Sequence, residues 1–254
     1  MSKKLSLLSL ITFGLVLSTS SVRADSTLVA VASNFTKPMT EIAESFEKAT
    51  GHSAKLSFGS TGKFVSQIQN GGPFEVLLAA DETGPALLEK EGLAVSGTRS
   101  VYAIGKLVLW SATAGYVDTE GTVLKTGHFK HLAIADPKLA PYGAAAVDYL
   151  KKQGLLDKIQ PLMVFGENIS QTQQFISTGN AELGFVALAQ VIENGKIGSG
   201  SGYIIPASEY ATIRQGVALL KNGSDNPAAI ALLAYLKSAP ALAIIQKYGY
   251  DLPK

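Results

Sequence analysis

The chain has 254 residues, of which 46% are apolar and 17% are charged, and its formal net charge is +2. This composition excludes an intrinsically disordered chain and predicts one large domain or two smaller ones. The sequence contains no cysteine, which excludes disulfide scaffolds, Cys-ligated zinc, iron–sulfur clusters and thiol nucleophiles.

Residues 1–24 have the pattern of a secretory signal peptide. Lys3 and Lys4 precede an apolar run, and small residues follow up to Ala24. The apolar run is shorter than the roughly 18 residues that a transmembrane helix requires. We therefore expect cleavage between Ala24 and Asp25, and export of the rest of the chain.

Removal of this segment changes the sign of the net charge. The chain has 22 basic and 20 acidic residues, and Lys3, Lys4 and Arg23 belong to the signal segment. Residues 25–254 therefore carry 19 basic and 20 acidic side chains, a net charge of −1. Because no basic stripe remains to bind a phosphate backbone, we expect no binding to nucleic acid.

Predicted strands and helices alternate along the rest of the chain, as in parallel α/β folds. The strands are expected at residues 27–32, 54–58, 75–80, 106–111, 132–135, 162–165, 183–188, 203–206 and 213–220. The helices are expected around residues 39–46, 64–68, 85–91, 144–150, 168–179, 190–193, 228–237 and 241–248. Residues 195–202 have the composition of the most flexible segment.

The pattern restarts after residue 100, which predicts a second lobe inserted into the first. Lobe 1 is expected to contain residues 25–105 and 207–254, and lobe 2 residues 106–206. We expect a mainly parallel sheet flanked by helices in each lobe, with two strands crossing between the lobes. Ligands of such sheets bind beyond the carboxyl ends of the strands, so the strand–helix turns of both lobes would converge in a cleft.

Four of these turns share the same chemistry. Each offers unpaired backbone N–H groups at a helix start, and most add a hydroxyl or an amide. They are Ser33-Asn34, Ser60-Thr61-Gly62, Pro141-Tyr142-Gly143 and Asn168-Ile169-Ser170. A helix N-terminus carries about half a positive charge and binds anions without a formal cation. Two such turns from each lobe favour a small, fully deprotonated oxyanion.

Other functions are less well supported by the residues. Each turn taken alone is also explained by ordinary helix capping. The turn at 59–62 is not a P-loop, because Ser57 replaces the first glycine and Phe64 the final hydroxyl residue. His128 and His131 have a spacing that metal ligands can have, but no third ligand lies nearby in the sequence. We expect no enzyme and no cofactor; a secreted hydrolase and a sensor or adhesion module are the alternatives from other classes.

Four segments occur in the order and at the intervals of a known family: residues 31–35 (VASNF), 58–63 (FGSTGK), 136–143 (DPKLAPYG) and 247–250 (KYGY). They resemble the periplasmic molybdate-binding proteins, which are soluble receptors of ABC importers. The resemblance implies a two-lobed type II periplasmic binding protein fold, molybdate or tungstate as the ligand, and an inner-membrane ABC permease as the partner. It also implies a monomer. A receptor for another tetrahedral oxyanion, such as sulfate, is the nearest alternative.

The resemblance also implies ligand positions in lobe 1. Ser33 matches the first hydroxyl ligand, with Asn34 beside it as a backbone donor. Thr61 matches the second serine of the usual Gly-Ser-Ser-Gly turn, with Ser60 before it. Molybdenum would be bound only as molybdate, through these residues and those of lobe 2.

In lobe 2, Tyr142 and Ile169 match two further ligand positions, and Ile169 would bind through its backbone N–H. One branch of the family has a ligating tyrosine where Ala187 stands here, and a small residue where Tyr142 stands. We therefore expect Tyr142 to supply the phenol from the other turn. The size of the cavity would separate molybdate and tungstate, which are nearly isosteric, from the smaller sulfate.

Overall fold

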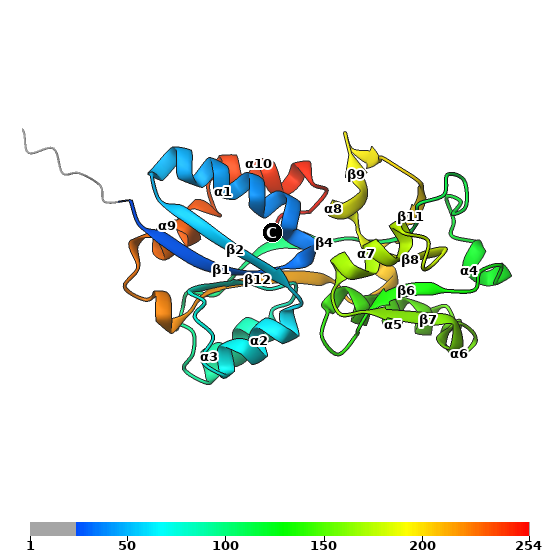
Figure 1. Cartoon of the computed structure of the whole chain (residues 1–254), viewed down its shortest axis with the longest axis horizontal. Helices are drawn as coiled ribbons and strands as arrows, with labels where there is room; N and C mark the ends of the chain where they lie inside the picture. Colours follow the sequence, from blue (N-terminus) through cyan, green and yellow to red (C-terminus); the bar gives the residue numbers. More distant parts are fainter. Residues whose placement is uncertain (1–23, 254) are drawn as a thin grey trace, which may run out of the picture.

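The computed structural model describes residues 24–253, which form two lobes lying side by side along the long axis of the molecule (Figure 1). Apart from Ala24, the predicted signal peptide lies outside the described residues. In the described range no single helix is long and apolar enough to cross a membrane; a test of length and composition is passed only by two consecutive helices together, bent by 63° at their junction.

Lobe 1 is built on a five-stranded sheet in the order β2-β1-β3-β12-β4. Its strands are β1 (Ser26–Ala32), β2 (Ser53–Gly59), β3 (Val76–Leu78), β4 (Ser100–Gly105) and β12 (Ile213–Leu219). Its helices are α1 (Thr36–Thr50), α2 (Thr61–Gln69), α3 (Thr83–Lys90), α9 (Pro227–Tyr235) and α10 (Ala239–Lys247), with 3-10 turns at Ser33–Phe35 and Lys221–Gly223.

Helices pack on both faces of this sheet, and successive side chains of β1 point alternately into the two cores. Val29 and Val31 belong to the core formed with α1, α9 and α10, whereas Ala30 belongs to the core formed with α2 and α3. In Figure 1, α1 and α10 lie above the strands, and α2 and α3 lie below them. Helix α1 ends at Gly51, whose φ of +75° is the left-handed conformation that glycine adopts without strain.

Lobe 2 is built on a second five-stranded sheet, in the order β11-β5-β8-β6-β7. Its strands are β5 (Leu107–Ser111), β6 (Leu132–Ala135), β7 (Met163–Gly166), β8 (Leu183–Ala187) and β11 (Ser201–Ile204), and a small hairpin joins β9 (Ile192–Glu193) to β10 (Lys196–Ile197). Its helices are α4 (Val123–Thr126), α5 (Pro141–Lys152), α6 (Leu156–Ile159), α7 (Ile169–Ser177) and α8 (Leu188–Val191), with 3-10 turns at Gln160–Leu162 and Ala207–Glu209.

The direction of the strands agrees with the expected mainly parallel sheets, with one reversed strand in each. In lobe 1, β1 is parallel to β2 and β3, and only β12 runs the other way, antiparallel to β3 and β4. Likewise β6 is parallel to β7 and β8, but β5 is antiparallel to β8 and β11. The antiparallel ladders all involve the strands next to the crossings between the lobes. Their direction is set by where the chain leaves and re-enters each lobe, not by a local βαβ unit.

The chain crosses between the lobes twice. At the first crossing only Lys106 separates β4 from β5, and at the second, residues 205–212 join β11 to β12. The lobe ranges expected from the sequence divide the chain in these two segments. We propose the two crossings as the lobe boundaries.

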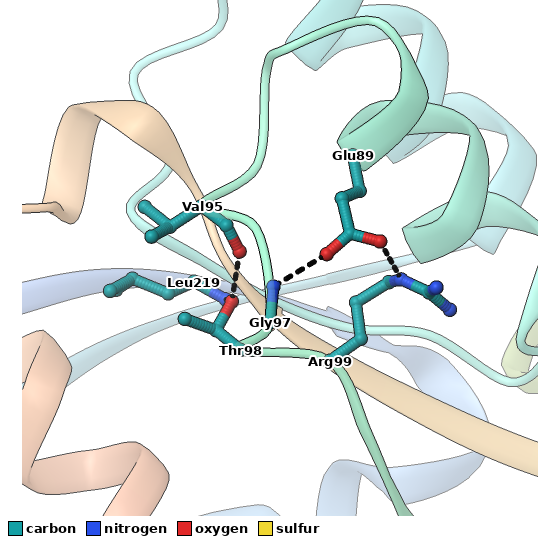
Figure 2. Close-up of polar contacts among 6 residues, drawn as sticks. All are labelled: Glu89, Val95, Gly97, Thr98, Arg99 and Leu219. Carbon is teal, nitrogen blue, oxygen red and sulfur yellow. Dashed lines mark hydrogen bonds and ion pairs between the residues drawn. The ribbon is translucent and has the colours of Figure 1, made fainter.

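Hydrogen bonds and an ion pair hold residues 95–99, which lead into β4, against lobe 1 (Figure 2). The Glu89 carboxylate accepts a hydrogen bond from Gly97 N–H at 2.8 Å and pairs with Arg99 Nε. The Thr98 hydroxyl donates to Val95 O at 2.7 Å and accepts from Leu219 N–H of β12 at 3.3 Å. Strand β4 therefore enters the crossing from a fixed position beside β12.

Three local expectations differ from the structure. Strand β4 was not predicted: the strand expected at 106–111 is β5, and no element was expected at 100–105. The helix expected at 190–193 begins at Leu188 and gives way to β9. Residues 195–202, expected to be flexible, contain β10 and the start of β11, because backbone pairing with β9 and β5 is independent of their Gly- and Ser-rich side chains.

Candidate functional site

The two lobes meet around a small cavity at the carboxyl ends of β1 and β2 and at the starts of α5 and α7. Its volume is about 10 Å³, close to the space that one water molecule needs. The lining residues are Ala32, Ser33, Asn34, Gly59, Ser60, Thr61, Ala80, Ala140, Pro141, Tyr142, Asn168 and Ile169. All six ligand residues expected from the sequence are among them, and no lining side chain is formally charged. Its lining, with helix starts and hydroxyl groups and no charged side chain, has the chemistry of a site for a small inorganic anion.

The first turns of three helices direct N–H groups toward this cavity. Thr61 is the first residue of α2, Ile169 is the first of α7, and Tyr142 follows Pro141 at the start of α5. The N–H groups of these three residues have no hydrogen-bond acceptor within residues 24–253. Because N-terminal helix N–H groups carry partial positive charge, the three turns together form a neutral site for negative charge.

Two hydroxyl groups from the α2 turn add to these donors. Ser60 is 3% exposed, and its Oγ has no hydrogen-bond partner in the described part of the chain. Thr61 Oγ1 accepts a hydrogen bond from Ala80 N–H at 2.9 Å, so its own proton is free for another acceptor. An unpartnered buried hydroxyl is costly unless a ligand satisfies it.

Ser33 links the first turn of lobe 1 to the α7 turn of lobe 2. Its hydroxyl donates to Asn168 Oδ1 at 3.2 Å, and its backbone O accepts from the Ser170 hydroxyl at 3.2 Å. Asn168 Oδ1 also caps α7 by accepting from the N–H groups of Ser170 and Gln171. A second backbone contact, from Gly62 N–H to Leu139 O at 2.9 Å, joins the lobes beside the cavity.

Tyr142 lines the cavity and is 1% exposed, and its hydroxyl lies against Gln215 of β12 and Gly105 of β4. The hydroxyl oxygen accepts a hydrogen bond from Gln215 Nε2 of β12 at 3.1 Å. A Cβ at Gly105 of β4 would lie 2.2 Å from this oxygen, so glycine is required there for the strand to pass. Burial, and then the nearby hydroxyl of Tyr250, raise the pKa of Tyr142 well above its usual range. Its hydroxyl therefore stays protonated and neutral at physiological pH.

The side chain of Asn34 points toward the crossing strands. Its Nδ2 donates to Gln215 Oε1 at 2.8 Å and to the Tyr250 hydroxyl at 2.9 Å. The Tyr250 hydroxyl in turn donates to Asn34 O at 2.9 Å. Both protons of the Asn34 amide nitrogen are thus used within the protein, and its backbone N–H stays the group expected to bind a ligand.

Charged side chains lie beside the cavity without lining it. Lys63 Nζ of α2 and Glu167 Oε2, which precedes α7, form an ion pair of 2.6 Å between the lobes. Both side chains are nearly half exposed. On the other side, Lys37 Nζ of α1 donates to Gln190 O of α8 at 2.9 Å. The lobes are therefore held together on both sides of the neutral cavity.

Other residues singled out by the sequence lie elsewhere. Ala187, where a family branch has a tyrosine, is buried at the end of β8, and its N–H donates to Gln190 Oε1. His128 and His131 lie between α4 and β6, where His131 N–H donates to Glu182 Oε2. Among residues 24–253 no group of three or more His, Asp or Glu side chains is arranged to hold a metal ion.

Roles for the side chains of Asn168 and Gln215 were not predicted from the sequence. Asn168 was noted only as part of a turn, although an Asn directly before a helix is an N-cap signal. Gln215 lies in a strand whose other residues after Arg214 are apolar or glycine. A lone amide in such a strand indicates a buried polar group that needs hydrogen-bond partners.

Comparison with known proteins defines the class. The model of the family described as bacterial extracellular solute-binding protein matches residues 27–251, and the chain belongs to this family. A molybdate-binding protein ModA from Azotobacter vinelandii is 59% identical over 224 residues, which are 88% of this chain and 89% of that protein. ModA from Rhodobacter capsulatus is 49% identical over 227 residues, which are 89% of this chain and 88% of that protein.

A solved structure agrees with these relatives. The periplasmic molybdate-binding protein of Azotobacter vinelandii superposes with a TM-score of 0.87 at 41% identity, covering 90% of this chain and 100% of that one. The chain therefore has the two-lobed type II periplasmic binding protein fold that was expected.

Proposed function

We propose that this protein is a periplasmic receptor that captures molybdate, and also tungstate, between its lobes and delivers it to an ABC permease. The names of its relatives support the ligand, since ModA proteins from two organisms match most of the chain at 59% and 49% identity. The observation that carries the proposal is the cavity between the lobes, which contains hydrogen-bond donors from both lobes and no charged side chain.

The chemistry of the donors fits a fully deprotonated oxyanion. Hydrogen bonds to a charged group contribute roughly 1.5–3 kcal/mol each. Several donors together would offset the desolvation of the anion and leave micromolar to nanomolar affinity, about 8–12 kcal/mol. No carboxylate lines the cavity to accept the proton of a species such as hydrogen phosphate. Selection against protonated anions follows from this arrangement.

Binding would also draw the lobes together. The backbone N–H of Thr61 belongs to lobe 1, whereas those of Tyr142 and Ile169 belong to lobe 2. An anion reaches both sets of donors only when the lobes are closed, so it stabilises the closed form by its differential affinity for that form. The closed, loaded form is the one that the permease would recognise.

Titration calorimetry of the exported protein, freed of carried-over ligand, with molybdate, tungstate, sulfate and phosphate tests the proposal. We expect submicromolar binding of molybdate and tungstate, and weak or absent binding of the other two. Tight sulfate binding would replace the molybdate assignment with the alternative oxyanion. Failure of folded protein to bind any of the four would show that the turns are plain helix caps.

The site itself is tested by a double substitution, Ser33→Ala with Thr61→Ala, which removes the free Thr61 donor and the Ser33 hydroxyl, whose proton would have to turn from Asn168 to the anion. Molybdate affinity should fall at least tenfold, since each donor to an anion contributes more than about 1.4 kcal/mol. Tyr235→Phe is a matched control, because it removes a hydrogen bond to Ser45 between α9 and α1. Unchanged affinity in the double variant would contradict the site.

A further inference from the structure

Gly62 brings the backbones of the two lobes into direct contact beside the cavity. It is the second residue of α2, so its N–H has no acceptor within the helix, and it donates to Leu139 O of lobe 2 at 2.9 Å. Among residues 24–253, no other hydrogen bond between two backbone groups joins the lobes outside the crossing segments. Thr61 and Ala140, the sequence neighbours of this pair, both line the cavity. The contact therefore couples a wall of the cavity in lobe 1 to a wall in lobe 2.

This contact leaves no space for a side chain at position 62. A Cβ there would lie 3.1 Å from both Leu139 Cα and Leu139 O, and 3.5 Å from the Leu139 carbonyl carbon. All three atoms belong to the backbone of the other lobe, so they cannot move aside by a change of rotamer. The lobes approach each other this closely only because residue 62 is glycine.

Both partners of the contact are held in place within their own lobes. On the side of lobe 2, the N–H groups of Leu139 and Ala140 donate to Asp136 O at 3.0 and 2.8 Å, which closes the turn before α5. On the side of lobe 1, the N–H of Phe64 donates to Ser60 O at 3.1 Å, which closes the first turn of α2. Two ordered turns therefore meet, and neither is a loose loop.

Other contacts between the lobes use long side chains, which pull without fixing a distance. Lys63 Nζ pairs with Glu167 at 2.6 Å, and Lys37 Nζ donates to Gln190 O at 2.9 Å. A lysine side chain has several rotatable bonds, so it can keep such a contact over a range of separations. The backbone contact differs, because the repulsion between its atoms rises steeply once they touch.

We propose that the contact between Gly62 and Leu139 is the stop that sets the width of the closed cavity, which makes Gly62 a determinant of the size of the oxyanion that is bound. This inference rests on the proposed function, because it assumes that a tetrahedral oxyanion lies between the lobes. The starts of α2 and α5, with Thr61 and Tyr142, stand on opposite sides of the contact. The stop therefore fixes the anion diameter at which the donors of both lobes are within hydrogen-bond distance. A smaller anion loses the donors of one lobe.

Gly62→Ala tests the inference, because the added methyl group would hold the lobes apart by a few tenths of an ångström. Chromate and molybdate are the probes, since both are tetrahedral dianions at mildly alkaline pH and chromate is the smaller. The substitution should weaken molybdate binding about threefold and chromate binding at least about tenfold, because the wider cavity puts one lobe out of reach of the smaller anion. Calorimetry gives the ratio of the two dissociation constants, with displacement of chromate by molybdate where chromate binds weakly.

This ratio separates a stop from a general cost of closing the lobes. A change that only destabilises the closed form weakens both anions by the same factor, since both require the same closure. Lys63→Met is the matched control across the same interface, because it removes the attraction to Glu167 and leaves the stop in place. Gly72→Ala is the control for a tight methyl group within lobe 1, where the Cβ would lie 2.8 Å from Gln67 O. Both controls should leave the ratio within about twofold of that of the unsubstituted protein.

The outcomes distinguish this inference from the proposed function. If the unsubstituted protein does not bind molybdate, the proposed function fails. If it binds molybdate, but Gly62→Ala leaves both affinities unchanged or weakens both by the same factor, the contact is not the stop. Thermal unfolding without anion provides the second measurement. Failure of Gly62→Ala to fold would also contradict the inference, because the methyl group would then clash within lobe 1 and not between the lobes.

Discussion

Thr61 and Tyr142 share a feature that explains how a site without charge can favour an anion. Each hydroxyl oxygen accepts an N–H from the protein, from Ala80 in one case and from Gln215 in the other. The Thr61 hydroxyl therefore keeps its proton for another acceptor, such as an anion in the cavity that Thr61 lines. Donors that are fixed before binding cost no reorganisation when the anion arrives.

The raised pKa of Tyr142 predicts how binding responds to pH. Burial disfavours the phenolate, so the folded pKa lies well above the usual value of about 10. Because the neutral donor persists below that pKa, molybdate affinity should not fall through loss of this proton between about pH 7 and about pH 9. Calorimetry at several pH values across this range measures the molybdate affinity. A decrease in affinity that disappears in Tyr142→Phe would show that the phenol titrates there.

Gly143 illustrates how closely α5 approaches β6. A Cβ at this position would lie 2.0 Å from Ala135 O. Alanine is favoured over glycine in a helix by about 1 kcal/mol, but no flexible side chain can yield to this clash, because the contacted atom is backbone. Gly143→Ala should therefore destabilise the protein by about 1–3 kcal/mol, visible as a lower Tm. An unchanged Tm would mean that the start of α5 can shift.

At the scale of elements, the start of α7 combines a structural and a functional role. Asn168 caps two N–H groups of the helix and accepts from Ser33 in the other lobe. Asn168→Ala should cost about 1 kcal/mol of stability through loss of the cap, and should also weaken molybdate binding. Asn226→Ala is the matched control, since Asn226 caps α9 but does not line the cavity. It should lower stability without changing affinity; equal effects of the two substitutions on binding would contradict the role of Asn168.

The elements that the sequence predicted best have strong local signals. Strand β1 alternates toward two cores, and α1 combines helical spacing with a glycine end. The one reversed strand of each sheet, β12 or β5, was not predicted, because chain crossings that no local pattern encodes place it. Similarly, residues 195–202 look flexible from composition, but backbone pairing does not require bulky side chains.

The part of the site that could be predicted from the sequence is the part formed by the starts of helices. Ser60, Thr61, Tyr142 and Ile169 are next to visible turn signals, and the structure brings them around one cavity. The hydrogen-bond chain through Gln215 could not be predicted, since it joins residues 181 positions apart in the sequence, as for Asn34 and Gln215. Long-range side-chain contacts of this kind depend on the packing of both lobes.

On the scale of the whole molecule, the contacts between the lobes determine how readily the cleft closes. Lys63→Met removes the ion pair with Glu167 and leaves a carboxylate near the dianion, so both effects reduce molybdate affinity. Because both side chains are nearly half exposed, the loss should be at most about 1 kcal/mol, or about fivefold, and should shrink in high salt. Lys55→Met, an exposed lysine of β2, is the control. Salt-independent loss would contradict an electrostatic origin.

The route of the chain through the two sheets also constrains the order in which the protein can fold. Lobe 2 uses one continuous stretch of chain, but the sheet of lobe 1 places β12 between β3 and β4, and Tyr250 completes the contacts of Asn34. A growing chain that lacks the residues from 213 onward has an open gap in that sheet, and one that lacks Tyr250 has no such partner for the first site turn. Capture of an anion therefore requires residues 213–250 to be in place, so export of a partly made chain would deliver no anion.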